Sequence, residues 1–248
     1  MMSDELLRER CRSNLATVRG RVADACHRAG REPAGVRIVG VTKYVPVGHA
    51  RLLLEAGCSD LGESRPQGVW EKGAALTTAR FHLIGPLQRN KVRRTLPLVD
   101  LIHTLDSLRL LESLHAEARL AGRTSGALVE VNLDGDPGRS GIPPAAVAGL
   151  LDMAAALDTA GAEGGIRILG LMGMASAPRP SDPADASRRQ FALLRALRDQ
   201  MAAHHPGLDE LSMGMSGDFE DAILEGATIV RIGSALWEGM PTAATDGG

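Results

Sequence analysis

The sequence contains few cysteines, no long apolar run and almost no net charge, and each absence excludes a class of protein. Its three cysteines, Cys11, Cys26 and Cys58, are scattered without metal-ligand spacing, which fits a reduced, intracellular protein. No segment approaches the ~18 consecutive apolar residues that span a membrane. Lys and Arg number 28 against 30 for Asp and Glu, so there is no basic field for nucleic acid and no basic block for a membrane surface.

The start of the chain also lacks the apolar segment of a signal peptide. Residues 1–30 are dense in Arg, Asp and Glu, so we expect a cytoplasmic protein. A chain of 248 residues suits one (β/α) barrel or two small domains. Because no linker or change of composition divides it, we expect a single domain over residues 1–248.

Alternating strand and helix signals fill the chain. Strands are predicted at residues 36–43, 58–63, 80–84, 101–105, 127–132, 168–174, 208–213 and 227–232. Helices are predicted at residues 3–29, 47–56, 65–76, around 88–92, and at 107–121, 143–160, 184–204 and 217–225. Ser3, Asp106 and Ser216 are the expected helix caps. Eight strand-then-helix units imply a parallel sheet with right-handed crossovers, and at this length they favour a closed (β/α)8 barrel over an open doubly wound sheet.

The strand candidate at residues 36–43 ends in Lys43. With period-two alternation, Val39, Val41 and Lys43 share one face, so the lysine is expected to point into the protein. Burial disfavours a charged amine, and an uncharged amine attacks carbonyl groups to form Schiff bases. The alternative is a strand-end lysine whose ammonium group returns to solvent.

Two segments near the C-terminus resemble a phosphate cradle. Residues 211–218 (LSMGMSGD) and 230–234 (VRIGS) each place glycine and serine where a strand turns toward a helix. Glycine allows close approach of the backbone, serine donates, and helix N-termini offer free N–H groups. The loops after strands seven and eight of barrel enzymes frequently bind phosphate. The alternative is that Ser216 and Ser234 are ordinary helix caps.

A strand-end lysine together with a phosphate site suggests pyridoxal 5'-phosphate (PLP) held as an internal aldimine. Arg231 alternates with Ile229 on the last strand, so it should point into the barrel near that ligand. An arginine facing the pyridine nitrogen only donates hydrogen bonds and leaves that nitrogen unprotonated. The alternative is that Arg231 forms an interior salt bridge, for instance with Glu63.

Several motifs together resemble the YggS/PROSC family of pyridoxal phosphate homeostasis proteins. They are residues 39–43 (VGVTK), 61–64 (LGES), 81–91 (FHLIGPLQRNK), 170–172 (GLM), 211–219 (LSMGMSGDF) and 230–234 (VRIGS). The resemblance runs in order from about residue 5 to residue 239 and implies a fold-type III PLP barrel with the cofactor on Lys43.

The same resemblance assigns roles to further residues. It implies that Ser212, Ser216, Gly233 and Ser234 hold the phosphate and that Arg231 faces the pyridine nitrogen. Met172, Met213 and Ser64 complete the expected cofactor contacts. Ser64 stands where the family usually has Asn, and Arg139 stands where a lysine is common. No catalytic residue or metal ligand is expected, and His82 is expected to be an interior histidine.

Three functions remain open from the sequence. The first is a PLP carrier and buffer that turns over little or nothing and supplies PLP-dependent apo-enzymes, as a monomer. The second is an amino-acid racemase of the alanine racemase type, which needs a second acid–base group. The only tyrosine, Tyr44, follows Lys43 and should face away from the barrel interior. The third is a lysine aldolase that uses Lys43 on a sugar phosphate without a cofactor; visible absorption would separate it from the other two.

Overall fold

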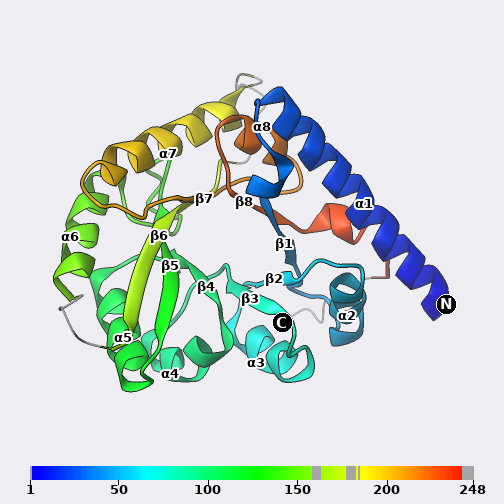
Figure 1. Ribbon diagram of the computed structural model, residues 1–248, viewed down its shortest axis with the longest axis horizontal. Helices are drawn as coiled ribbons and strands as arrows, with labels where there is room; N and C mark the ends of the chain where they lie inside the picture. Colours follow the sequence, from blue (N-terminus) through cyan, green and yellow to red (C-terminus); the bar gives the residue numbers. More distant parts are fainter. Residues whose placement is uncertain (1, 158–162, 177–182, 184, 242–248) are drawn as a thin grey trace.

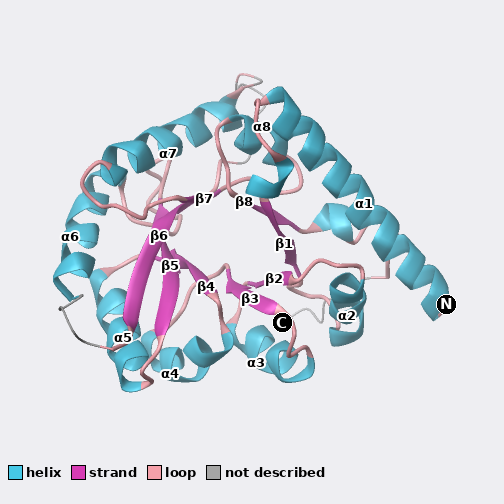
Figure 2. Cartoon of the chain, in the orientation of Figure 1, coloured by secondary structure: helices cyan, strands magenta, loops and turns pink. Residues whose placement is uncertain are grey.

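The computed structural model describes residues 2–157, 163–176, 183 and 185–241. The eight strands form a closed barrel in sequence order, and every neighbouring pair is parallel (Figures 1 and 2). They are β1 (Arg37–Val41), β2 (Asp60–Glu63), β3 (Arg80–Leu83), β4 (Leu101–Leu105), β5 (Thr124–Val131), β6 (Gly165–Gly173), β7 (Glu210–Ser212) and β8 (Ile229–Ile232). The predicted (β/α)8 barrel is therefore confirmed.

The helices surround the strands (Figure 2). They are α1 (Asp4–Arg28), α2 (Val47–Glu55), α3 (Pro66–Ala75), α4 (Val92–Thr95), α5 (Leu108–Leu120), α6 (Val147–Leu157), α7 (Ala186–Ala202) and α8 (Phe219–Leu224). Short 3-10 turns are η1 (Pro33–Gly35), η2 (Arg89–Lys91), η3 (Leu96–Leu98), η4 (Pro144–Ala146) and η5 (Ser234–Leu236). Among the described residues, no helix has the length and apolar content needed to cross a bilayer.

The extra helix before the first strand is present as predicted. The Ser3 hydroxyl accepts a hydrogen bond from the Leu6 N–H at 3.3 Å and caps α1. Cys11, Leu15, Val18 and Val22 form a buried stripe on this helix. The stripe packs against the outer core, and α1 lies beside α8 in the ribbon view (Figure 1).

Several predicted boundaries move. Ser107 rather than Asp106 caps α5, since its hydroxyl accepts from the Leu110 N–H at 3.3 Å. The expected helix 217–225 begins only at Phe219, so Ser216 lies outside it. The first strand ends at Val41, two residues before Lys43. Parts of the predicted helices 143–160 and 184–204 and of the loop 175–183 lie outside the described residues.

The closed sheet separates two apolar layers. Most buried apolar residues lie between the strands and the helices. A smaller cluster comes from alternate positions of five strands and fills the barrel interior: Val39, Leu101, Leu128, Met172 and Ile229. Polar side chains that share this inward face are therefore buried, and they are the first candidates for function.

Candidate functional site

Lys43 lies at the C-terminal end of the barrel, but it is not buried. After Val41 the chain leaves the sheet, and the Val45 N–H bonds to the Thr42 carbonyl at 3.0 Å to close a turn. Lys43 occupies this turn and is exposed, so the expectation of a buried amine is wrong. The physical reason is that the strand stops two residues early, and alternation no longer directs the side chain inward.

The turn that holds Lys43 carries backbone strain. Tyr44 has a φ of 63°, the one positive value outside glycine among the described residues. Tyr44 is 59% exposed, and the Arg65 guanidinium lies 5.6 Å from the centroid of its ring. Tyr44 thus faces away from the barrel interior, as predicted. Strained backbone of this kind persists where surrounding structure holds it in place.

Thr42 anchors the start of this turn. Its N–H bonds to the Gly62 carbonyl at 2.9 Å, and its hydroxyl donates to the Glu63 carboxylate at 2.6 Å. The same carboxylate pairs with the buried Lys72 ammonium at 2.7 Å. Glu63 is therefore held by α3 and by the Lys43 turn, and the alternative in which Arg231 pairs with Glu63 is wrong.

The Ser216 hydroxyl gathers backbone donors from the end of β8. It accepts from the Gly233 N–H at 3.1 Å and from the Ala235 N–H at 3.4 Å. Ser216 does not cap α8; the residue at the cap position is Asp218, whose carboxylate accepts instead from the Met215 N–H. The Ser216 oxygen thus accepts hydrogen bonds from two backbone N–H groups around the start of η5. Anions bind to proteins in the same arrangement.

Ser234 lies beside this cluster and is exposed. A surface pocket is lined by Ser216, Gly217, Ser234, Ala235 and Glu238. A Cβ on Gly233 would meet only ordinary contact with Val41, at 3.7 Å. The Trp237 indole N–H also donates to the Val41 carbonyl at 2.8 Å. These two contacts place the pocket next to the end of β1, and so next to the turn that carries Lys43.

Arg231 points into the barrel, as alternation on β8 predicts. It is 4% exposed and pairs in register with Val39 of β1. Its guanidinium donates to the Ser212 hydroxyl at 2.7 Å and to the Gly173 carbonyl at 3.1 Å. Burial lowers the pKa of Arg231 to about 10, while Asp218 and Glu130 oppose that shift. The group therefore stays a cation at neutral pH.

The remaining predicted contacts separate into three places. Ser212 and Met172 lie on the interior face, and the Ser212 hydroxyl bonds to Arg231 and His103. Met213 packs in the outer layer, because alternation on β7 turns it away from Ser212. Ser64 is half-buried after β2 and meets the Gly85 segment: a Cβ on Gly85 would lie 2.2 Å from the Ser64 carbonyl oxygen.

The structure adds two interior residues that sequence reasoning missed. His103 is fully buried, with its ring nitrogens 2.9 Å from His82 and 2.8 Å from Ser212. Glu130 is 3% exposed and accepts from the Ser140 hydroxyl; burial raises its pKa. Each is a polar residue inside an apolar strand, and that isolated polarity was the available signal.

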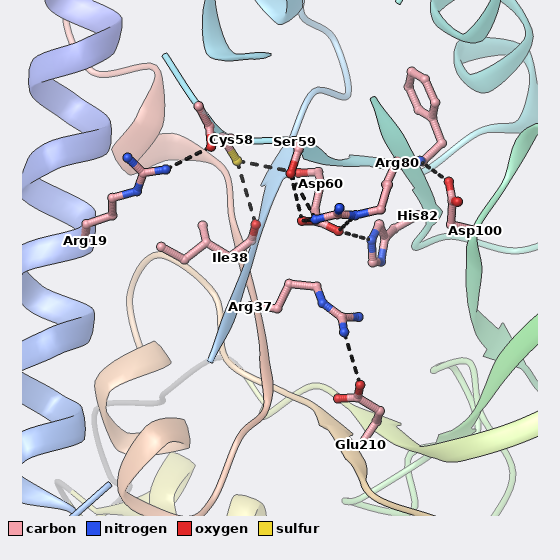
Figure 3. Close-up of polar contacts among 12 residues, drawn as sticks. Arg19, Arg37, Ile38, Cys58, Ser59, Asp60, Arg80, His82, Asp100 and Glu210 are labelled. Carbon is pink, nitrogen blue, oxygen red and sulfur yellow. Dashed lines mark hydrogen bonds and ion pairs between the residues drawn. The ribbon is translucent and has the colours of Figure 1, made fainter. Parts of the chain in front are cut away.

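His82 is an interior histidine, as expected, and it contacts the N-terminal end of the barrel. Its Nε2 lies 3.0 Å from the Asp60 carboxylate, which also pairs with Arg80 at 2.6 Å (Figure 3). Burial opposes ionisation of Asp60, but the hydrogen bonds from His82 and Arg80 dominate and hold its pKa well below the usual range.

Arg139 ties two loops at the C-terminal end. It pairs with Asp134 at 2.6 Å and donates to the Met174 carbonyl at 2.9 Å. The Ser176 hydroxyl and, after it, the Arg139 guanidinium donate hydrogen bonds to the Asp134 carboxylate and lower its pKa to about 2. The loops after β5 and β6 are thereby joined beside the barrel mouth.

Comparison with known proteins places the chain in a family. The family model for the N-terminal domain of alanine racemase matches residues 13–241. The chain is 37% identical over 226 residues to the pyridoxal phosphate homeostasis protein of Aquifex aeolicus, covering 90% of this chain and 95% of that protein.

Solved structures agree. PipY of Synechococcus elongatus with PLP bound superposes with a TM-score of 0.76 at 31% identity, covering 91% of this chain and 99% of that one. Alanine racemase of Clostridium difficile, at 16% identity and a TM-score of 0.71, covers 94% of this chain and 58% of its own, and shares the fold alone. The chain therefore belongs to the YggS/PROSC family of pyridoxal phosphate homeostasis proteins, built on the barrel of the alanine racemase N-terminal domain.

Proposed function

We propose that this chain binds PLP at the C-terminal end of its barrel and buffers or delivers it, with little or no catalysis of its own. One observation carries the proposal: β1, β7 and β8 end together and bring three complementary groups to one mouth. These are the Lys43 amine, the N–H cluster at Ser216 and the buried Arg231 guanidinium. PLP homeostasis in the named relatives and the PLP held by PipY support the same ligand.

The chemistry of these groups fits PLP. Bound PLP supplies an aldehyde that reacts with amines and a ring that withdraws electrons. Lys43 offers an amine in a turn next to the phosphate pocket, and it would hold the aldehyde carbon. The Gly233 and Ala235 N–H groups, with Ser216 and Ser234, would hold the phosphate. Arg231 would face the pyridine nitrogen, since its guanidinium is aimed into the barrel and only donates.

The other residues of the expected contact set are proposed in supporting places. Met172 would line the ligand from the interior, and Ser64 would border the mouth after β2. The Ser212 hydroxyl already bonds to Arg231 and His103, so we assign it to the Arg231 end of the ligand. Met213 supports the loop through its packing and through its N–H, which bonds to the Ile229 carbonyl at 3.1 Å.

The site favours holding PLP over turning over amino acids. A guanidinium with a pKa of about 10 does not give a proton to the ring nitrogen, and this weakens the electron sink that a carbanion requires. Racemisation also needs a second proton carrier on the opposite side. Tyr44, the one tyrosine in the chain, is exposed and turned toward Arg65.

The biological setting follows from the same reading. We propose that the partners are PLP-dependent apo-enzymes, that the chain acts as one domain over residues 1–248, and that it works as a monomer. The three cysteines are unpaired and buried, which suits a reducing cytoplasm.

The deciding experiment is reduction of the PLP complex with borohydride followed by peptide mapping. The chain has three lysines, so the result is easily assigned. Lys72 is buried against Glu63, and Lys91 lies in η2. We expect visible absorption before reduction and a label on Lys43 alone. Lys43→Ala should lose the label and Lys91→Ala should keep it; a label on another lysine would refute the assignment.

A further inference from the structure

Five buried polar side chains form a continuous line through the barrel interior. It begins at Asp60 on β2 and continues through His82 on β3 and His103 on β4. It then passes through Ser212 on β7 and ends at Arg231 on β8. The successive contacts measure 3.0 Å, 2.9 Å, 2.8 Å and 2.7 Å. None of the five residues is more than 5% exposed. Asp60 opens β2, so the line begins at the N-terminal end of the barrel and ends at the proposed cofactor site.

The donors and acceptors along this line can be assigned in order. Asp60 is ionised and only accepts, so the Nε2 of His82 carries a hydrogen. In the neutral form of His82 the Nδ1 accepts, and the Nε2 of His103 is then the donor between the two rings. By the same logic the Nδ1 of His103 accepts from Ser212.

Ser212 completes the sequence. With its O–H directed at His103, its lone pairs remain for the Arg231 guanidinium, which donates to it. Every hydrogen bond from Arg231 to Asp60 then points the same way. Nη2 of Arg231 donates separately to the Gly173 carbonyl. Two nitrogens of the guanidinium group therefore have fixed partners.

A proton added at His82 would reverse the two central hydrogen bonds of the line. His82 would then donate to His103, whose other nitrogen would donate to Ser212. Burial, aided by the positive charges of Arg231 and Arg37, keeps the pKa of His103 well below its ordinary value and opposes an extra proton there. The groups around the outer end are Arg37, Asp60, Arg80, Asp100 and Glu210, which line a pocket with His82 (Figure 3).

We propose that His82, His103 and Ser212 are positioning residues that transmit the ionised state of Asp60 through the barrel and hold Arg231 in one orientation. Asp60 sets the tautomer of His82, His82 sets that of His103, and His103 sets the direction of the Ser212 hydroxyl. Arg231 is aimed by its contacts with Ser212 and Gly173. The use of that orientation by a bound ring rests on the proposed function, but the line itself does not.

The first test uses the PLP-free protein. Nitrogen NMR of histidine- and arginine-labelled protein should show both His82 and His103 as neutral rings with hydrogen on Nε2. In Asp60→Asn, an amide can donate as well as accept, so the tautomer of His103 and the Arg231 signals should both change, although neither residue touches Asp60.

Asp100→Asn is the matched control at the same barrel end, because Asp100 accepts from the Phe81 N–H and lies outside the line. It should leave the His103 and Arg231 signals in place. Unchanged His103 or Arg231 signals in Asp60→Asn, or equal changes in Asp100→Asn, would overturn the proposal.

The second test separates this inference from the proposed function. Ser212→Ala should weaken the binding of PLP about 5-fold or more, which corresponds to the loss of one hydrogen bond. An analogue with carbon in place of the pyridine nitrogen should bind wild type and variant alike. If the NMR changes occur but both ligands weaken equally, the line orients Arg231 as proposed and the assignment of Arg231 to the ring nitrogen is refuted.

Discussion

Lys43, just beyond the end of β1, and Arg231, on the neighbouring strand β8, lie in opposite environments. Val39 and Arg231 pair in register, and both lie on the interior face. Arg231 falls within β8 and is buried, whereas Lys43 lies beyond the end of β1 and is exposed. A fixed guanidinium suits recognition of a ring atom, and an amine in a turn remains reachable by an aldehyde that enters from solvent.

Ser216 and Ser234 provide the test of phosphate binding at the residue scale. We expect the double substitution Ser216→Ala and Ser234→Ala to weaken the binding of PLP far more than the binding of unphosphorylated pyridoxal. Each charge-assisted hydrogen bond lost should cost roughly 1.5–3 kcal/mol of binding free energy. Titration of both ligands by absorption measures the difference. Equal weakening of the two ligands would show that these serines have no special part in anion binding.

At the scale of elements, the loop between β7 and α8 depends on Gly214. Its φ is 92°, and a Cβ there would lie 2.8 Å from the Phe219 Cα and 2.6 Å from the Ala222 Cβ. The Gly214 carbonyl also accepts from the Arg231 N–H at 3.0 Å. Gly214 therefore holds the loop before α8 close to that helix and to the strand that carries Arg231.

Gly214→Ala should lower the free energy of unfolding by about 1–3 kcal/mol, the usual cost of strained backbone, and weaken PLP binding. Gly217→Ala is the control for stability in the same loop: Gly217 has no positive φ, and an added Cβ would meet nothing within 4 Å. Urea unfolding of both variants and PLP titration of Gly214→Ala check the prediction. Equal loss of stability in the two variants would contradict it.

Contacts among the buried side chains of Thr42, Glu63 and Lys72 join the ends of β1 and β2. It fixes where the Lys43 turn begins. Gly68 on α3 makes room for it, since a Cβ there would lie 2.5 Å from the Glu63 carboxylate. The motif 61–64 (LGES) thus contributes mainly to the placement of strand ends.

At the scale of the whole molecule, the interior line makes stability sensitive to acid. The pKa of His103 in the folded state lies well below its ordinary value. As the pH falls below ~6.5, His103 is therefore protonated in the unfolded chain before it is protonated in the folded one, and the folded state loses stability. Asp60, with a depressed folded pKa, contributes stability above ~3.9 that is lost at lower pH. Both groups therefore lower the free energy of unfolding as the pH falls.

We expect the free energy of unfolding to decrease as the pH falls below ~6.5, and to decrease further below ~4. Denaturant titrations at a series of pH values measure it. Glu130 acts in the opposite direction because its pKa is raised. The difference between wild type and His103→Gln isolates the first effect, and identical pH profiles of the two proteins would exclude it.

The barrel as a carrier can be tested directly. We expect PLP-loaded protein to exchange the α-hydrogen of L- and D-amino acids, and to racemise them, far below the ~1–1000 per second of ordinary enzymes. Proton exchange followed in deuterium oxide, with an alanine racemase as positive control, measures both. Slow exchange that vanishes in Lys43→Ala agrees with the proposal, whereas enzyme-like turnover would support the racemase alternative.

The amino-acid sequence alone was sufficient to predict the closed barrel. Period-two apolar runs and helix caps are local signals, so the eight strands could be read along the chain, as could the inward direction of Arg231. The family motifs are also local, and relatives confirm the family that they indicated.

Only the tertiary structure decided the relations that depend on where strands stop and which ones meet. Lys43 is exposed because β1 ends at Val41, and Glu63 turns to Lys72 because α3 packs there. His103, Ser212 and Arg231 lie far apart in the chain and meet through closure of the barrel. Such contacts are set by the register of the whole sheet, and no short segment of sequence contains that register.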